Sequence, residues 1–166
     1  MTVTRLKKTY SVISNAMKMS IADNGFPETW DTGLSSSDFA KKYFVKYFNI
    51  NKFYEPGELN LMEIEKKYTW LDGSQVQTDI HSFITNPNEP LIELNDGTLI
   101  LVHFTPRYNN RYFLEIDIDG YRKGFNQAGK DYFSFTIDYT TLIAALIRIP
   151  SALMFIAAFL SRSCFS

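Results

Sequence analysis

The chain has 166 residues, of which 45% are apolar and 16% aromatic, with 17 basic and 18 acidic side chains. This length and apolar fraction are enough for one domain with a core, and the aromatic content favours β structure. The formal net charge of −1 gives no electrostatic reason to expect nucleic acid as a partner. The single cysteine, Cys164, excludes a disulfide within the chain.

Residues 4–23 are expected to form an amphipathic helix. Apolar side chains recur there at three- and four-residue steps and form the stripe of an assembly helix, which either covers the sheet or packs with neighbouring helices: Leu6, Tyr10, Ile13, Met17 and Ile21. Asn24-Gly25 predicts the end of this helix, and Pro27 follows. No strong capping residue opens the helix, and one hypothesis is that it continues upstream of Met1 in a longer precursor.

A loop is predicted over residues 26–36 and a second helix over residues 37–49. Ser35 or Ser36 can cap this helix, and Asp38 lies in its first turn, where a negative charge is favoured. The broad aromatic face of the helix predicts core packing. Further along, a short strand is expected at residues 68–71.

The second half of the chain predicts an antiparallel meander. Two apolar runs, 91–94 and 99–104, flank Asn95-Asp96-Gly97-Thr98, a hairpin signal. Two alternating segments, 112–118 and 133–137, follow. The alternation predicts half-buried strands whose polar side chains face water, namely Glu115, Asp117, Ser134 and Thr136.

A polar, glycine-rich loop lies between these last two strands. The positions that define it as a structural loop are Gly120, Lys123, Gly124, Asn126 and Gly129. Side-chain oxygens that can tie the loop to its own amides come from Asp117, Asp119, Asn126 and Asp131. A calcium site is the alternative, with Asp117, Asp119 and Asp131 as candidate ligands. An EF-hand is disfavoured, because its twelfth position here is Asn126 and not a glutamate.

Catalytic signatures are missing from the sequence. It contains no Gly-x-Ser-x-Gly elbow and no glycine-rich phosphate loop before a helix. His81 and His103 are the two histidines, and each is expected to be structural or exposed. We therefore expect neither an enzyme nor a bound cofactor.

The segment from Leu142 to Leu160 is almost continuously apolar, with interruptions at Arg148 and Pro150. A membrane helix needs about 20 such residues, and an arginine near the bilayer centre is costly. Three interpretations stay open: a buried terminal helix, a frayed apolar tail, or a membrane anchor.

Two segments carry a resemblance to a known family. Residues 5–25 are similar to the soluble half of the long N-terminal helix in type IV pilins, including the pseudopilins of type II secretion. Residues 117–135 resemble the pattern Asp-x-Asn-Gly-x-Lys-Gly-Pro-Asn-x-x-Gly-x-Asp-x-Phe-x-Phe near the end of the globular domain in bacterial prepilin-like proteins. Asp119 replaces the usual Asn, and Phe125 the usual Pro.

The resemblance covers roughly residues 4–137, with the helix at 41–48 and the Asp96-Gly97 hairpin in family-like order between the two segments. It implies a pilin-like α+β domain, in which the N-terminal helix packs on an antiparallel sheet of about four strands. Three regions follow: the exposed half of the helix (1–25), the globular domain (26–137) and an atypical apolar tail (138–166).

The resemblance also implies a function. The chain is expected to be a structural subunit of a type IV pilus or type II secretion pseudopilus. Its partners would be other pilin subunits and the inner-membrane assembly machinery, and its location the bacterial cell envelope, from inner membrane and periplasm to the cell surface. In the family, a leader and an apolar half-helix precede the soluble half and associate with the membrane in the precursor. The alternative is a membrane-tethered binding or hydrolytic domain anchored through residues 142–160.

Overall fold

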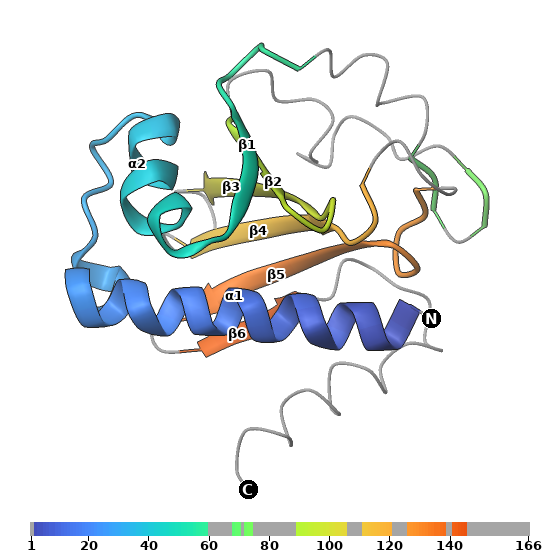
Figure 1. Cartoon of the computed structure of the whole chain (residues 1–166), viewed down its shortest axis with the longest axis horizontal. Helices are drawn as coiled ribbons and strands as arrows, with labels where there is room; N and C mark the ends of the chain where they lie inside the picture. Colours follow the sequence, from blue (N-terminus) through green and yellow to red (C-terminus); the bar gives the residue numbers. More distant parts are fainter. Residues whose placement is uncertain are drawn as a thin grey trace, which may run out of the picture.

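The computed structural model describes residues 2–59, 68–70, 72–74, 89–105, 111–120, 126–138 and 141–145. It has the expected α+β architecture, in which an N-terminal helix lies against an antiparallel sheet (Figure 1). The helices are α1 (Thr2–Asn24) and α2 (Ser36–Tyr43), with 3-10 turns at Pro27–Thr29 and Val45–Tyr47. The strands are β1 (Ile50–Tyr54), β2 (Leu91–Leu94), β3 (Leu99–Thr105), β4 (Arg111–Asp117), β5 (Tyr132–Asp138) and β6 (Thr141–Ala145).

The sheet is a meander whose spatial order follows the chain, from β1 to β6. The expected count of about four strands is corrected to six, because β1 and β6 extend the sheet at its two edges. The alternation that identifies an ordinary strand is missing from β1, whose register with β2 shifts between Ile50 and Lys52. Such a bulge puts one extra residue on one strand and breaks the two-residue period.

Strand β6 also corrects the boundary drawn at residue 138. It pairs with β5 from Ser134↔Ala145 to Asp138↔Thr141, so the apolar run that begins at Leu142 starts as part of the sheet. The rest of that run, from residue 146, lies outside the described residues. Among the helices within the described ranges, none is long and apolar enough to cross a membrane.

Helix α1 packs its predicted stripe against the sheet. Leu6, Ile13 and Met17 are buried, and Tyr10 and Ile21 are half-buried beside the same core. The buried face also includes three smaller residues that the apolar pattern did not predict: Thr9, Ala16 and Ser20. Since these side chains are short, the helix can lie close to its neighbours. Gly25 ends the helix with a positive φ of 78°, as predicted.

The second helix is shorter than predicted. Ser35 caps it, because its hydroxyl accepts a hydrogen bond from the Asp38 amide at 3.1 Å. The helix ends at Tyr43 and not at residue 49, and a 3-10 turn replaces its expected second half. Phe44 has φ −130° at this junction and is fully buried among other aromatic rings. Burial of this ring therefore accompanies the break, which helix periodicity alone did not predict.

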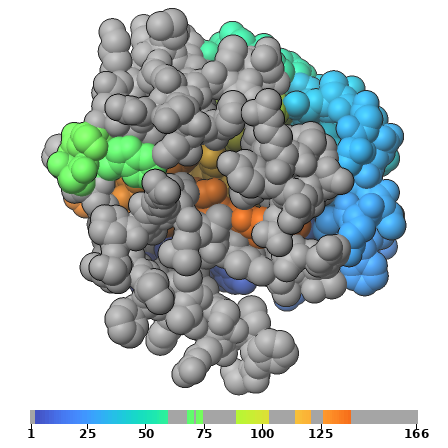
Figure 2. Space-filling model, turned by 180° about the vertical axis from the view of Figure 1, so that it is seen from behind, coloured from blue at the N-terminus to red at the C-terminus, as the bar shows by residue number. Residues whose placement is uncertain are grey.

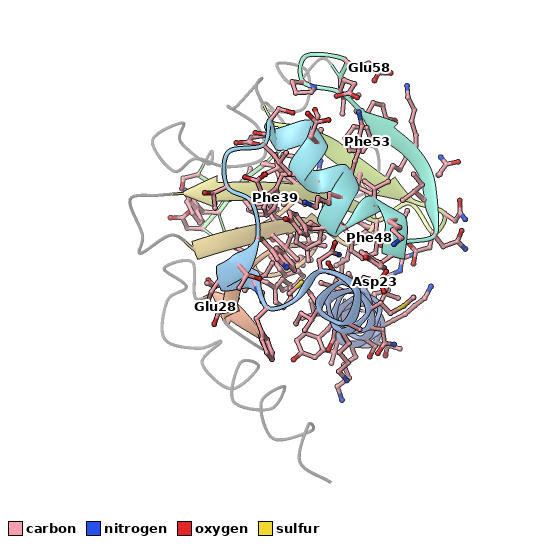
Figure 3. All side chains as sticks on the ribbon, turned by 90° about the vertical axis from the view of Figure 1, so that its left-hand side faces the viewer. Asp23, Glu28, Phe39, Phe48, Phe53 and Glu58 are labelled. Carbon is pink, nitrogen blue, oxygen red and sulfur yellow. The ribbon has the colours of Figure 1, made fainter. Side chains whose placement is uncertain are left out.

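The central strands of the sheet are buried on both faces where their side chains are described, and this overturns the expectation that their polar side chains face water. The front face is apolar and packs against α1 and α2 in one cluster, and Phe39 and Phe48 lie between α2 and the sheet (Figure 3). On the back face, Glu115, Asp117, Ser134 and Thr136 are each at most 9% exposed. A second cluster that includes Tyr68 and Tyr132 lies on that face, so alternating polarity here marks a buried polar layer.

Candidate functional site

The predicted structural loop meets the β2–β3 turn at one end of the sheet, the end at which α1 begins (Figure 1). The two turns approach closely at Gly120 and Gly97. A Cβ added at Gly120 would lie 2.6 Å from the Gly97 carbonyl oxygen, and Gly120 has φ +80°. The Thr98 hydroxyl adds a hydrogen bond to the Ile118 carbonyl at 3.4 Å. We call these two connected turns the two-turn end of the domain.

Asp117 holds this end together from inside. Its Oδ1 accepts hydrogen bonds from the amides of Asp119 at 3.1 Å and Gly120 at 2.8 Å. Its Oδ2 accepts a short hydrogen bond from the Tyr68 hydroxyl, which comes from a segment 49 residues away. The carboxylate is fully buried, so three donors depend on one acceptor group that water does not reach.

Burial raises the pKa of Asp117 to about 6, although its three hydrogen bonds oppose the shift. Burial also raises the pKa of the Tyr68 hydroxyl, and the neighbouring Asp117 charge adds to that shift. Tyr68 is therefore a neutral donor at ordinary pH. This pair joins the back-face segment to the loop through a single buried contact.

The remainder of the described loop continues the same pattern. The carboxylate of Asp131 accepts a hydrogen bond from the Gln127 amide, and its carbonyl accepts one from the Ile118 amide at 2.8 Å. Burial raises the pKa of Asp131. Asn126 is buried with φ +44°, a conformation that asparagine tolerates better than most residues.

The expected strand at residues 68–71 is instead one isolated bridge. Thr69 pairs with Gln127, through an amide hydrogen bond to the Asn126 carbonyl at 3.0 Å and one from the Ala128 amide at 2.9 Å. Figure 2 shows residues 68–70 and 72–74, in green, at one side of the back of the molecule. The loop between β4 and β5 is therefore also held in place by Thr69, which comes from another part of the chain.

Two basic residues of α1 reach the two-turn end. Lys8 Nζ lies 2.9 Å from Asp96 Oδ2, and Arg5 lies 3.7 Å from Asp119 Oδ2. The first turn of α1 is therefore linked to both connections. These pairs are partly exposed, so each adds little stability by itself, and their main effect is on the orientation of the side chains.

The remaining predicted site residues differ in whether the structure describes them and in where they lie. Lys123, Gly124 and His81 lie outside the described residues, and His103 lies on β3. Among the residues that the structure describes, no group of three or more His, Cys, Asp or Glu side chains could hold a metal ion. The oxygens of Asp117 and Asp131 instead accept hydrogen bonds from the loop's own amides.

Several contributors to this end were not predicted. Tyr68 and Gly97 carry essential contacts, yet the first lies far away in the sequence and the second was assigned only a hairpin role. Arg5 and Lys8 lie outside the predicted apolar stripe, and no partner was predicted for them. Arg5 and Lys8 are three residues apart and so lie on the same side of the helix. The β2–β3 turn contains Asp96 and the β4–β5 loop contains Asp119, and this match of charges is the signal that could have paired them.

We predict that Gly120→Ala destabilises the domain by more than the cost of its positive φ, which is about 1–2 kcal/mol. The excess arises because the new Cβ would overlap the Gly97 oxygen. Urea unfolding of Gly57→Ala provides the control, since Gly57 has φ +79° and nothing within 4 Å of its added Cβ. Equal losses in the two variants would show that the contact between the turns contributes nothing.

We also predict that the contribution of Asp117 to the free energy of unfolding falls as the pH rises. Its folded pKa of about 6 lies above the reference value of 3.8, so the folded state binds more protons between these values. The contribution is complete below pH 4 and is lost through pH 6, about 3 kcal/mol in total. Other carboxylates titrate in the same range. The measurement is therefore the difference in unfolding free energy between the unmodified chain and Asp117→Asn, from pH 4 to 7.5. A difference that does not change with pH would contradict the prediction.

The chain belongs to DUF6613, a family of unknown function, whose family profile matches residues 1–141. This match spans α1, α2 and the first five strands and ends at the first residue of β6. No curated protein and no solved structure matches the chain.

Proposed function

We propose that this chain is a structural subunit of a type IV pilus or type II secretion pseudopilus, and that it acts by assembling into a filament. The observation that carries the proposal is α1, a 23-residue helix with one face buried on the sheet and the opposite face exposed. A helix that is already anchored in a domain leaves its outer face available for a neighbouring subunit.

The two-turn end adds support. The segment that resembles the prepilin-like pattern, residues 117–135, folds into a loop fixed by Asp117 and connected to the start of α1 through Arg5. A subunit that must pack repeatedly against copies of itself benefits from such a fixed loop. In this proposal, the domain has a pilin-like fold and belongs to a longer precursor that also contains the membrane half-helix. Its partners are other subunits and the inner-membrane assembly machinery.

The alternative, a binding or hydrolytic domain anchored through residues 142–160, has less support. Strand β6 uses residues up to Ala145, so the anchor would have to form from residues 146–160. That is fewer than the roughly 20 apolar residues that a membrane helix needs. Catalysis would also need a convergent group of titratable side chains in a pocket, and Asp117 is closed off from solvent.

The decisive experiment is to sequence the DNA upstream of the Met1 codon and to image the cells that express the gene. An in-frame Phe-Thr-Leu-x-Glu-type leader followed by an apolar helix, together with surface filaments that bind antibodies against this domain, would support the proposal. A stop codon directly upstream, with the domain found in no filament, would overturn it.

A further inference from the structure

Some charged side chains of this domain are neutralised within the chain. Within the described ranges there are five ion pairs: Arg5–Asp119, Lys8–Asp96, Lys41–Glu55, Lys46–Asp23 and Lys52–Glu58. Of the charged side chains outside these pairs, Lys18, Glu28 and Asp31 each lie close in the sequence to an exposed large apolar side chain.

One positive charge outside these pairs lies on the outer face of α1. Lys18 is exposed and forms no ion pair with any residue that the structure describes. Its neighbours at helical spacing are the exposed residues Ser11, Asn15 and Ala22, all short enough for another surface to approach closely. Met19 lies beside Lys18 and is 55% exposed.

Two negative charges outside these pairs lie just beyond the end of the same helix. Residues 26–38 contain Glu28, Asp31 and Asp38 but no lysine or arginine. Glu28 and Asp31 are exposed, and neither forms an ion pair with a described residue. Figure 3 shows Glu28 well apart from Asp23, the acidic residue that Lys46 neutralises.

The acidic segment also presents an apolar side chain. Phe26 is 52% exposed although it immediately precedes the buried Pro27. One patch thus combines an exposed phenylalanine with carboxylates that form no ion pair with a described residue. The other combines an exposed methionine with a lysine of the same kind. Aromatic rings and thioethers make favourable contacts, so charge and apolar area are complementary between the two patches.

We infer that these two patches bind each other between copies of this chain, with Glu28 and Asp31 of one copy against Lys18 of the next. Phe26 of the first copy packs against Met19 of the second. The two patches are different surfaces, so a single contact leaves one patch free on each copy, and we infer a head-to-tail arrangement that repeats without closing. This inference rests on the proposed function and deepens it by naming the surface through which successive subunits meet.

The charges determine which surfaces pair and in which register, whereas the apolar contact supplies more of the affinity. An exposed ion pair is worth little, and reversing one charge is expected to weaken the association about fivefold. The expected dependence on salt follows, because ions screen such exposed charges over about 10 Å at 0.1 M.

Cysteine cross-linking of the full chain in a Cys164→Ser background tests the contact. Lys18→Cys and Glu28→Cys are prepared separately, mixed at high concentration and oxidised mildly. We expect a disulfide-linked heterodimer that forms faster than either homodimer. Asp72→Cys, which is exposed and lies on the back-face segment, is the matched control partner for each variant.

A double variant distinguishes an open contact from a closed one. A chain that carries both Lys18→Cys and Glu28→Cys should produce a ladder of oligomers on oxidation. A product that stops at the dimer would overturn the head-to-tail arrangement. A heterodimer yield no higher than that with Asp72→Cys would overturn the contact itself.

Charge reversal provides the second measurement. Lys18→Glu and Glu28→Lys should each lower the association seen by sedimentation, and the chain with both changes should recover it. Both changed positions are on the surface, so thermal unfolding should be unaltered and can verify folding. No recovery in the double variant would contradict direct pairing of the two residues.

The same cysteine pair in assembled filaments separates this inference from the proposed function. If filaments contain the domain but Lys18→Cys and Glu28→Cys do not cross-link within them, the contact is wrong and the filament function stands. If no filament contains the domain, the proposed function fails, whereas cross-linking in solution would still demonstrate the contact.

Discussion

Asp117→Ala should remove about 3–5 kcal/mol from the free energy of unfolding, measured in urea at pH 5. The substitution leaves the Tyr68 hydroxyl and two loop amides without their acceptor, in a place that is fully buried. Each buried group left unsatisfied costs about 1–3 kcal/mol. At pH 5 the unmodified carboxyl is mostly neutral, because its pKa is about 6, so the loss reports hydrogen bonds and not relief from a buried charge.

Asp117→Asn is the matched control for this prediction. Its amide oxygen can accept the hydrogen bonds from the Asp119 and Gly120 amides, whereas its NH2 group cannot accept the one from the Tyr68 hydroxyl. We expect a loss at pH 5 that is well below that of Asp117→Ala, and a smaller loss at pH 7, where the unmodified carboxyl is charged. Equal destabilisation by alanine and asparagine would mean that the two-turn end depends on the carboxyl group for some reason other than its acceptors.

The consequence of Asp117→Ala for assembly follows from its position. The loop that it fixes faces the first turns of α1 through the Arg5–Asp119 pair. If the loop loosens, Asp119 no longer has a fixed position relative to the helix. Filament yield should then fall further than the loss of stability alone accounts for. A core variant with the same loss of stability is the control for this comparison.

The sequence was most informative where local patterns determine local structure. The stripe from Leu6 to Ile21 predicted both the existence of α1 and its buried face. The Asp96-Gly97 pair predicted the turn between β2 and β3, and Gly97 indeed has φ +86°. Both are short-range signals, since a helix stripe and a tight turn depend on residues a few positions apart.

Sequence patterns failed where a distant segment changes the environment of a residue. Glu115 and Ser134 alternate with apolar residues as in a strand half-exposed to water, but a second layer covers them. That layer includes Tyr68, and nothing near Asp117 in the sequence indicates that its partner lies 49 positions away. The same limit applies to β1, where a bulge removed the period on which strand prediction relies.

Phe44→Ala should cost about 3–5 kcal/mol, the usual range for truncating a fully buried phenylalanine. Phe44 is 0% exposed, and its ring lies 5.7 Å from Trp30 and 6.2 Å from Phe39, measured between ring centroids. Its removal leaves a cavity under the junction where α2 gives way to a 3-10 turn. Surrounding rings that stack on one another, such as Trp30 on Tyr43 at 4.4 Å, cannot easily collapse into that space.

Phe26→Ala is the matched control, because it removes the same side chain from a position that is 52% exposed. Its expected cost is within about 0.5 kcal/mol, as for most surface substitutions. The two variants also separate stability from assembly, since Phe26 belongs to the inferred contact between copies and Phe44 to the core. Phe44→Ala should lower the urea midpoint without altering cross-linking between Lys18→Cys and Glu28→Cys below that midpoint. Phe26→Ala should do the reverse, and a shared loss of both properties in either variant would show that the contact surface and the core are not independent.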